Sequence, residues 1–263
     1  MQKPLTGRTV VVTRAATQAA EFVSELESYG ATVINCPTIE ISDLDNYERL
    51  DEAIDHLYGY DWLIFTSTNG VEYLLRRLTH LNKNVSDLDA LKVCAVGVAT
   101  AEKLQDAHIH VDLLPSRFKA EAVFDALTAF LGGAHYLRNL NFLMPRALTG
   151  RDVLPKALEK AGARVDVVPA YRNVVPESVD RGKLVAMLAG SADCIAFTSS
   201  STVKNLALLF DTNDLSQTLQ SLAIACIGDI TAETAAQFGL TVDILPSEFT
   251  VPALAAAIAD YYR

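Results

Sequence analysis

The chain carries one sequence pattern twice, and this internal repeat restricts the possible folds more than any other feature. Five residues recur at an offset of 132 (146 − 14): Arg14, Gly30, Ala31, Val33 and Pro37 correspond to Arg146, Gly162, Ala163, Val165 and Pro169. Four later residues keep this offset: Asp61, Phe65, Thr66 and Ser67 correspond to Asp193, Phe197, Thr198 and Ser199. Near the end of each copy the offset is 131 (228 − 97): Gly97, Leu114 and Pro115 correspond to Gly228, Leu245 and Pro246. This stable register indicates two copies of one structural unit.

Each copy alternates short apolar runs, rich in β-branched residues, with stretches of helical periodicity. The runs predict strands at 9–14, 31–36, 62–67, 92–97, 111–115, 142–146, 164–169, 194–199, 223–228 and 242–246. The helical stretches that precede Gly30 and Gly162 end where a C-terminal glycine cap would stand. Strands that are apolar on both faces and alternate with helices are typical of parallel sheets covered on both sides. We therefore predict an α/β fold with two similar lobes, each a parallel sheet flanked by helices.

Two segments, 38–48 and 169–178, depart from this alternation and occupy equivalent places in the two copies. Both are short, extended and flanked by polar residues. We interpret them as crossovers between the lobes, paired as a two-stranded antiparallel ladder that can act as a hinge.

Composition and charge argue against several classes of function. The chain has 263 residues, of which 50% are hydrophobic, so it can bury a large core. Its net charge of −10 disfavours nucleic acid or an anionic membrane as the main partner. No apolar run approaches the roughly 20 residues that span a bilayer, and the N-terminal stretch lacks the apolar core of a signal peptide. We expect a cytoplasmic protein.

The cysteines and histidines do not form a metal-binding pattern. Cys36, Cys94, Cys194 and Cys226 lie in or beside apolar runs, and none belongs to a C-x-x-C pair. We interpret them as buried, reduced thiols. Because the histidines are not joined by a carboxylate or cysteine pattern, we expect no metal site.

Polar residues gather at four predicted strand-to-helix turns: "STNG" (67–70), "GVAT" (97–100), "SSST" (199–202) and "GDIT" (228–231). The unpaired amides and the dipole of a helix N-terminus favour an anion. Ligands of open parallel sheets gather at the carboxyl ends of the strands. We expect the four turns to face one cleft and to bind anionic groups. The alternative is that these residues are ordinary helix caps.

The sequence contains no Ser-His-Asp set, no paired carboxylates with an evident acid–base role, and no G-x-G-x-x-G or phosphate loop. This pattern fits an enzyme that works mainly by holding a flexible substrate in one shape. Two other classes stay open. One is a non-catalytic two-lobed binding protein for an anionic small molecule. The other is a nucleotide-sugar transferase, which would require a phosphate loop and acidic or histidine catalytic residues.

The ordered set "FTSTNGVEYL", "AVGVATAEKL", "MPRALTGRDVLPKALEKAGARVDVVPAYR", "FTSSSTV" and "CIGDITAETAAQFG" resembles the uroporphyrinogen-III synthase family, from Gly7 to about Ile258. The resemblance implies that each lobe is built from non-contiguous parts of the repeat. One lobe would contain residues 1–37 and 173–263, and the other residues 48–168. The linkers between them would be residues 38–47 and 169–172.

The resemblance also implies a function. Members of the family are lyases of heme biosynthesis that convert hydroxymethylbilane, a polycarboxylate linear tetrapyrrole, into uroporphyrinogen III. Water is lost, a spiro intermediate forms, and the macrocycle closes with ring D inverted. The family needs no cofactor and no metal. We expect a monomer without a nucleic-acid or membrane partner, which makes transient contact with the preceding enzyme of the pathway.

Two catalytic candidates follow from the resemblance. Tyr171, in "PAYR", matches a tyrosine that the family places at the cleft, where its phenol would protonate or hydrogen-bond the leaving hydroxyl. The equivalent position in the first copy is Ile39 (171 − 132), so the repeat itself does not require a hydroxyl there. Thr100 would donate a hydrogen bond near the same hydroxyl. The alternatives are that Tyr171 only packs in a strand and that Thr100 caps a helix.

Further residues are predicted to bind the substrate carboxylates. Arg14 and Arg146 end the first strand of each copy, and each is suited to pair with a carboxylate. The family often has a proline or a basic residue in the turn after "FTS", where this chain has Thr68 and Asn69. Because of this departure, carboxylate contacts at that turn are expected from the backbone and not from the side chains. Thr149 and Asp152 have the spacing of a capping box. The predicted substrate-binding set is Arg14, Ser67, Thr68, Asn69, Gly97, Val98, Arg146, Ser199, Ser200, Ser201, Gly228 and Thr231.

Overall fold

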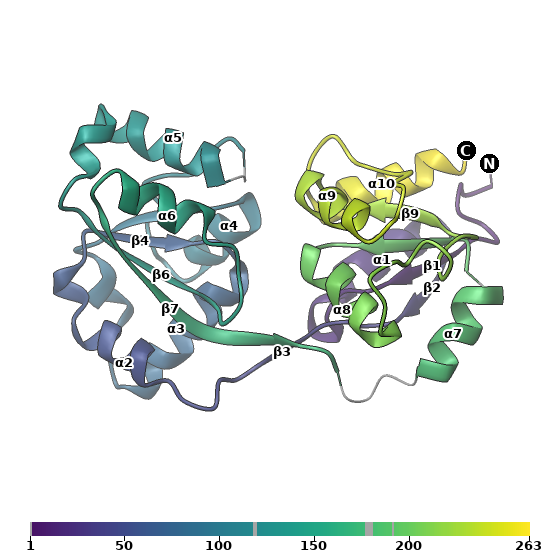
Figure 1. Cartoon of the computed structure of the whole chain (residues 1–263), viewed down its shortest axis with the longest axis horizontal. Helices are drawn as coiled ribbons and strands as arrows, with labels where there is room; N and C mark the ends of the chain where they lie inside the picture. The colour runs from purple at the N-terminus through teal and green to yellow at the C-terminus, as the bar shows by residue number, and fades with distance from the viewer. Residues whose placement is uncertain (1, 118–119, 177–180, 191) are drawn as a thin grey trace. The chain divides into compact units, whose positions relative to one another are not determined.

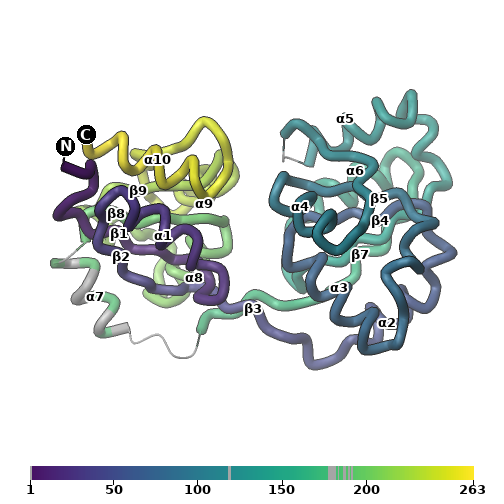
Figure 2. The backbone as a smooth tube through the Cα atoms, turned by 180° about the vertical axis from the view of Figure 1, so that it is seen from behind, coloured from purple at the N-terminus to yellow at the C-terminus, as the bar shows by residue number. Residues whose placement is uncertain are grey.

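The structure, a computed structural model, describes residues 2–117, 120–176, 181–190 and 192–263, so the predicted extended segment 169–178 ends outside them. The chain divides into two compact units. Unit 1 consists of Met1–Ile41 and Val174–Arg263, and unit 2 of Ser42–Asn173. The two ends of the chain therefore lie in the same unit (Figure 2).

Unit 1 is a four-stranded sheet with helices on both faces (Figure 1). The strand order is β2 (Thr32–Asn35), β1 (Thr9–Val12), β8 (Cys194–Phe197) and β9 (Ala223–Cys226), with parallel pairing throughout. Its helices are α1 (Ala20–Ser28), α7 (Arg181–Gly190), α8 (Ser200–Phe210), α9 (Asp229–Gln237) and α10 (Val251–Tyr261), with a 3-10 turn η1 (Ala16–Gln18). Alternate strand residues enter opposite cores: Val11 packs with α8 and α9, whereas Val10 and Val12 pack with α1 and α10.

Unit 2 is a five-stranded sheet (Figure 1). The order is β3 (Glu40–Ser42), β7 (Arg164–Val174), β6 (Asn141–Ala147), β4 (Trp62–Phe65) and β5 (Lys92–Ala95). The helices are α2 (Glu48–Asp55), α3 (Thr68–His80), α4 (Val98–Asp106), α5 (Ala120–Leu131) and α6 (Val153–Lys160). Three 3-10 turns are η2 (Leu57–Gly59), η3 (Val85–Leu88) and η4 (Ala134–Leu137).

In unit 2, α5 and α6 share one core with the sheet, and α3 lies against β4 and β6 with α2 and α4 beside it. The pairings of β4 with β5, β4 with β6, and β6 with β7 are parallel. The predicted α/β class, with parallel sheets flanked by helices, is confirmed. The neighbouring strands β3 and β7 contain the two points where the chain passes from one unit to the other, Ile41/Ser42 and Asn173/Val174.

The predicted strands at 111–115 and 242–246 are wrong. Each segment makes a single bridge, Leu113 to Cys94 in one unit and Ile244 to Ala225 in the other. The carboxylates of Asp112 and Asp243 accept the backbone N–H of the neighbouring strand at 2.8 Å and replace the next ladder bond. A proline stands two residues after each bridge, and its nitrogen cannot donate a further hydrogen bond to the ladder.

The glycine caps are confirmed, and they have the same geometry in both units. Gly30, after α1, has φ 95° and Gly162, after α6, has φ 93°, a region that favours glycine. The hydrogen bonds also match: Gly30 N to Glu27 O at 2.9 Å and Ala31 N to Leu26 O at 3.1 Å, and Gly162 N to Glu159 O at 2.9 Å and Ala163 N to Leu158 O at 3.1 Å. Both helices therefore end in a Schellman motif.

The structure shows which parts of the repeat pack together. Asp61 in unit 2 and Asp193 in unit 1 are equivalent positions. The carboxylate of Asp61 accepts the N–H of Asn141 at 2.8 Å, and that of Asp193 accepts the N–H of Thr9 at 2.8 Å. Because Asn141 is equivalent to Thr9 (141 − 132), each unit joins a segment of one predicted copy to a segment of the other.

Candidate active site

The turn after β4 holds the start of α3 close to β6. Ser67 is the N-cap of α3, and its Oγ accepts a hydrogen bond from Gly70 N at 3.1 Å. A Cβ on Gly70 would lie 2.8 Å from the backbone oxygen of Pro145. Glycine at this position therefore lets the first turn of α3 rest directly on β6.

Tyr171, on β7, meets this turn through its hydroxyl. The Tyr171 oxygen lies 2.9 Å from Ser67 Oγ, and the residue is only 5% exposed. Burial raises the pKa of the phenol, while hydrogen bonds with Ser67 and Asn69 and the charge of Arg146 act in the opposite direction. Three residues of the predicted set, Ser67, Asn69 and Arg146, thus act on a fourth, Tyr171.

Arg146, on β6, is held by the loop that follows it. Its Nη1 donates to Arg151 O at 2.6 Å and its Nη2 bonds to Asp152 Oδ1 at 2.5 Å. The hydrogen bond with Arg146 lowers the pKa of the Asp152 carboxyl group. The Arg146 Nε is buried without a hydrogen-bond partner in the part of the chain that the structure describes.

The capping box predicted at Thr149 and Asp152 is wrong. Helix α6 begins at Val153 with Asp152 as its N-cap residue. The Asp152 carboxylate bonds to Arg146 instead of a reciprocal partner in the turn. Asp152 therefore pairs with Arg146, six residues before it in the chain, and makes no side-chain cap bond.

A pocket of about 240 Å³ opens beside these residues in unit 2. Its polar lining includes Ser67, Arg146 and Tyr171, and its apolar lining includes Val96, Val123, Met144 and Leu154. The pocket therefore combines arginine side chains, hydroxyl groups and an apolar wall. This combination suits an acidic group carried on an apolar ring.

The turn after β5 differs from the expected cap. Gly97, with φ 111°, is the N-cap of α4, and Thr100 lies in the first helical turn. The alternative that Thr100 is an N-cap residue is therefore wrong. Thr100 is 4% exposed, and its hydroxyl donates to Val96 O at a long 3.4 Å. Val98, the first residue of α4, is 44% exposed.

Unit 1 contains the second pair of turns. Ser199 is the N-cap of α8 and accepts from Thr202 N at 3.3 Å, as Ser67 does for α3. The Ser200 hydroxyl donates to Ile230 O at 3.1 Å and accepts from Thr234 at 2.9 Å, which ties the first turns of α8 and α9 together. Helix α9 begins after Gly228, which places Thr231 in its first turn rather than at the N-cap.

Arg14 follows β1 at the position equivalent to Arg146. Its Nε is also buried and unpartnered among the residues that the structure describes. Burial lowers the pKa of Arg14, and the charge of Glu21 partly compensates. Each unit thus has a partly buried arginine at or just after the end of the strand that begins one copy of the repeat.

The predicted site residues are divided between the units. Unit 2 contains Ser67, Thr68, Asn69, Gly97, Val98, Thr100, Arg146 and Tyr171, and unit 1 contains Arg14, Ser199, Ser200, Ser201, Gly228 and Thr231. Sequence reasoning missed Asp152 as the partner of Arg146, and Tyr73, whose ring contacts Tyr171. The signal that could have found Tyr73 was its place in the quoted stretch "FTSTNGVEYL".

Other predictions concern metals, thiols and membranes. All four cysteines are free and buried, as predicted, and burial raises the pKa of Cys36 to about 11. Within residues 2–117, 120–176, 181–190 and 192–263, no group of three or more His, Cys, Asp or Glu side chains could hold a metal ion. None of the helices in the described residues is long and apolar enough to cross a membrane.

The chain is similar to known proteins of one family over nearly its whole length. The family profile described as "Uroporphyrinogen-III synthase HemD" matches residues 20–256. The uroporphyrinogen-III synthase of Synechococcus elongatus is 35% identical over 266 residues, which cover 100% of this chain and 98% of that protein. The enzyme of the same name from Chlorobaculum parvum is 33% identical over 255 residues, covering 96% and 98%.

Solved structures share the fold. A mutant uroporphyrinogen III synthase from Thermus thermophilus has a TM-score of 0.69 at 17% identity, covering 97% of this chain and 98% of that chain. The uroporphyrinogen-III synthetase of Helicobacter pylori has a TM-score of 0.58 at 18% identity, covering 97% and 100%. The matches give no support to the alternative of a non-catalytic binding protein. On the family profile and the two sequence relatives, the chain belongs to the uroporphyrinogen-III synthase family.

Proposed function

We propose that the protein is a lyase of heme biosynthesis that converts hydroxymethylbilane into uroporphyrinogen III. The terminal hydroxyl leaves as water, a spiro intermediate forms and reopens, and the macrocycle closes with ring D inverted. Family membership supports this reaction. The structural observation that carries it is the buried Tyr171 phenol, bonded to Ser67 on the wall of a pocket that also contains Arg146.

The surroundings of Tyr171 suit it to assist the departure of a hydroxyl group. Because burial raises the pKa of the phenol, Tyr171 keeps its proton at neutral pH. Ser67 Oγ accepts a hydrogen bond from Gly70 N, and its own proton can be donated to the phenol oxygen. The phenol proton then points to the leaving hydroxyl, while the electron-rich pyrrole supplies the electron pair that expels it. The proton that the substrate loses on ring closure restores the phenol.

Thr100 has a second, weaker role in this proposal. Its hydroxyl is bonded to Val96 O at 3.4 Å, which is long for a hydrogen bond between oxygen atoms. A substrate oxygen near the first turn of α4 can therefore compete for the Thr100 proton. A neutral hydroxyl is sufficient there, because the pyrrole drives the loss of water.

The substrate carboxylates require positive sites on a protein with a net charge of −10. We assign them to Arg146 and Arg14, whose Nε atoms are buried and unpartnered in the described chain, and to the first turns of four helices. At α3 and α8 the contacts would come from Ser67, Thr68, Asn69, Ser199, Ser200 and Ser201, and at α4 and α9 from Gly97, Val98, Gly228 and Thr231. The amides of a first helical turn and the helix dipole both favour an anion.

We further propose that the enzyme is a cytoplasmic monomer that receives its substrate by transient contact with the preceding enzyme of the pathway. The four free, buried thiols support a reducing compartment. Light scattering of the purified protein tests the monomer, and a dimer mass across micromolar concentrations would contradict it.

A coupled assay tests the function directly. Hydroxymethylbilane is generated in place by the preceding enzyme, with and without this protein, and the oxidised porphyrin isomers are separated. Without a catalyst the chain closes to the uninverted isomer I. The expected result is isomer III when the folded protein is present. Isomer I alone, with protein shown to be folded by circular dichroism, would contradict the proposed reaction.

A further inference from the structure

Tyr73, on α3, packs its ring against the ring of Tyr171. The ring centroids are 5.3 Å apart and the planes are inclined by 33°. Tyr73 is 7% exposed and Tyr171 is 5% exposed. Aromatic rings at this separation attract each other beyond the effect of burial alone. Since the Tyr171 hydroxyl also bonds to Ser67, the phenol is held both at its ring and at its oxygen.

Both contacts come from the same helix. Ser67 caps α3, and Tyr73 lies six residues later in it. At Gly70, the first turn of α3 lies close to Pro145 of β6, the strand next to β7. One rigid element therefore sets the position of the Tyr171 ring and of its hydroxyl.

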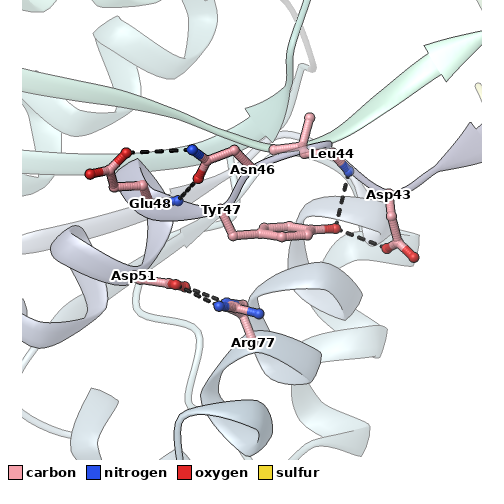
Figure 3. A network of polar contacts seen from close by, with 7 residues as sticks. All are labelled: Asp43, Leu44, Asn46, Tyr47, Glu48, Asp51 and Arg77. Atoms are coloured by element: carbon pink, nitrogen blue, oxygen red, sulfur yellow. Dashed lines mark hydrogen bonds and ion pairs between the residues drawn. The ribbon is translucent and has the colours of Figure 1, made fainter.

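Tyr73 also has a cationic neighbour. The Arg76 guanidinium lies 4.7 Å from the centre of the Tyr73 ring, and Arg76 pairs with Asp43 at 3.1 Å. Asp43 in turn accepts the hydroxyl of Tyr47 at 2.8 Å (Figure 3). These side chains line a groove of about 670 Å³ on unit 2. Tyr73 thus connects this polar network to the buried Tyr171.

The same network reaches the residue after Tyr171. Arg172 Nε donates to Ser42 Oγ at 3.2 Å, and its Nη1 bonds to Asp45 at 3.0 Å. The segment 42–47 therefore contacts β7 through Arg172 and α3 through Arg76. Tyr171 has neighbours from this network both along β7 and across to α3.

We propose that Tyr73 is a positioning residue, which orients the Tyr171 phenol through ring packing and not through its own hydroxyl. The proposal rests on the catalytic role assigned to Tyr171 above. A proton donor has to lie within a fraction of an ångström of its productive position, and misplacement by about 1 Å can lower a rate by about 100-fold. Ser67 bonds only to the hydroxyl of Tyr171, whereas Tyr73 contacts the Tyr171 ring.

The kinetic test compares two substitutions at one position. Tyr73→Phe keeps the ring, and we expect kcat to stay within about twofold of the wild type. Tyr73→Leu keeps a buried apolar side chain without the ring, and we expect kcat to fall about 10- to 100-fold with KM nearly unchanged. In a Tyr171→Phe background, Tyr73→Leu should cause little further loss, because the two residues act through one phenol.

Tyr47→Leu is the matched control. Tyr47 belongs to the same network, but its partners are Arg77 and Asp43. The Arg77 guanidinium lies 4.9 Å from the centre of the Tyr47 ring, and the Tyr47 hydroxyl bonds to Asp43. We expect this variant to keep kcat near the wild-type value. An equal fall in kcat for Tyr47→Leu and Tyr73→Leu would overturn a specific role for Tyr73.

A measurement that does not depend on activity separates this proposal from the proposed function. In protein with 13C-labelled tyrosine, the Tyr171 signals are assigned by their absence in Tyr171→Phe. We expect the order parameter of the Tyr171 ring to fall in Tyr73→Leu and to stay at the wild-type value in Tyr73→Phe. An ordered Tyr171 ring in Tyr73→Leu would overturn the positioning role. If the ring loses order while Tyr171→Phe retains full activity, the assigned catalytic role of Tyr171 fails, and the positioning role for catalysis is overturned with it.

Discussion

Arg146 already binds a carboxylate in this structure, the side chain of Asp152 at 2.5 Å. The side chain of Arg146 is 14% exposed and that of Asp152 is 51% exposed. A partly buried guanidinium without a counter-charge would be costly, and Asp152 compensates it. If Arg146 binds a substrate carboxylate as proposed, that carboxylate has to compete with Asp152 for the same cation.

We predict that Asp152→Asn lowers KM for hydroxymethylbilane severalfold. The amide binds Arg146 more weakly than a carboxylate does, so the substrate displaces it more easily. The measurement is initial rate against substrate concentration in the coupled assay. Asp106→Asn, which removes an exposed carboxylate at the end of α4, is the control for the change in net charge. A KM that is unchanged or higher in Asp152→Asn would contradict a competitive role for Asp152.

We predict that Asp193 contributes a pH-dependent share of stability to unit 1. Burial raises its pKa, but the N–H of Thr9 and the side chain of Arg8 lower it more, and the net pKa lies below the ordinary 3.8. Because the folded pKa is the lower one, the contribution is full above about pH 4 and is lost as the pH falls through the folded pKa. Asp193→Asn should lower the free energy of unfolding by about 1–2 kcal/mol at neutral pH.

Urea unfolding at neutral pH and near pH 3 measures this contribution. The difference between wild type and Asp193→Asn should shrink at the lower pH. A difference of the same size at both pH values would mean that the Asp193 charge does not stabilise the folded state.

At the scale of elements, the start of α3 is the part of the site with the least steric tolerance. We predict that Gly70→Ala destabilises the protein by about 1–3 kcal/mol, because the new Cβ would lie 2.8 Å from the Pro145 oxygen. The shift of α3 should also move Ser67 away from Tyr171 and lower kcat. Gly190→Ala, where a Cβ meets no described atom within 4 Å, is the control and should be neutral or slightly stabilising. Equal stability of the two variants in urea unfolding would contradict the close contact.

The equivalent elements support a common origin of the two units. The order β2, β1, β8, β9 in unit 1 corresponds to β7, β6, β4, β5 in unit 2, position by position in the repeat. The serine N-caps of α3 and α8 and the aspartate bonds at Asp61 and Asp193 recur at the same offset. We infer that the chain arose by duplication of one α/β unit whose halves pair across the copies.

At the scale of the whole molecule, the two units differ in how the chain builds them. Unit 2 is the continuous segment Ser42–Asn173, whereas unit 1 needs both ends of the chain. We predict that a fragment of residues 40–174 folds alone, because its sheet and core are complete and its length is that of an ordinary domain. Thermal unfolding followed by circular dichroism should show one cooperative transition, and a non-cooperative melt would contradict this prediction.

The truncated chain 1–173 is the matched comparison. It contains all of unit 2 but leaves β1 without its neighbour β8, which exposes Val10, Val11 and Val12. We expect it to aggregate where the fragment 40–174 stays monomeric. Neither of these two shortened chains should form isomer III, because the proposed substrate-binding residues of α8 and α9 are missing from both.

Local interactions made much of this molecule predictable from its sequence. The serine caps, the glycine C-caps and the buried apolar strands depend on residues within one or two turns of each other, so short patterns indicate them correctly. The strand predictions around Leu113 and Ile244 were wrong, because in each segment an aspartate side chain replaces the ladder bond that a continuing strand would need.

Only the tertiary structure decided which strands pair and which side chains come into contact. Two similar copies offer equivalent strands, and sequence periodicity cannot distinguish pairing of β1 with β8 from pairing within one copy. The contacts Tyr171–Tyr73 and Tyr171–Ser67 join β7 to a helix about 100 positions earlier in the chain, as the separation of 104 residues for the Ser67 bond shows. Asp152 is different: it is the N-cap residue of α6, but its carboxylate pairs with Arg146, six residues earlier, instead of making a cap bond. Secondary structure follows from short-range periodicity, whereas the site depends on which side chains the packed sheets bring together.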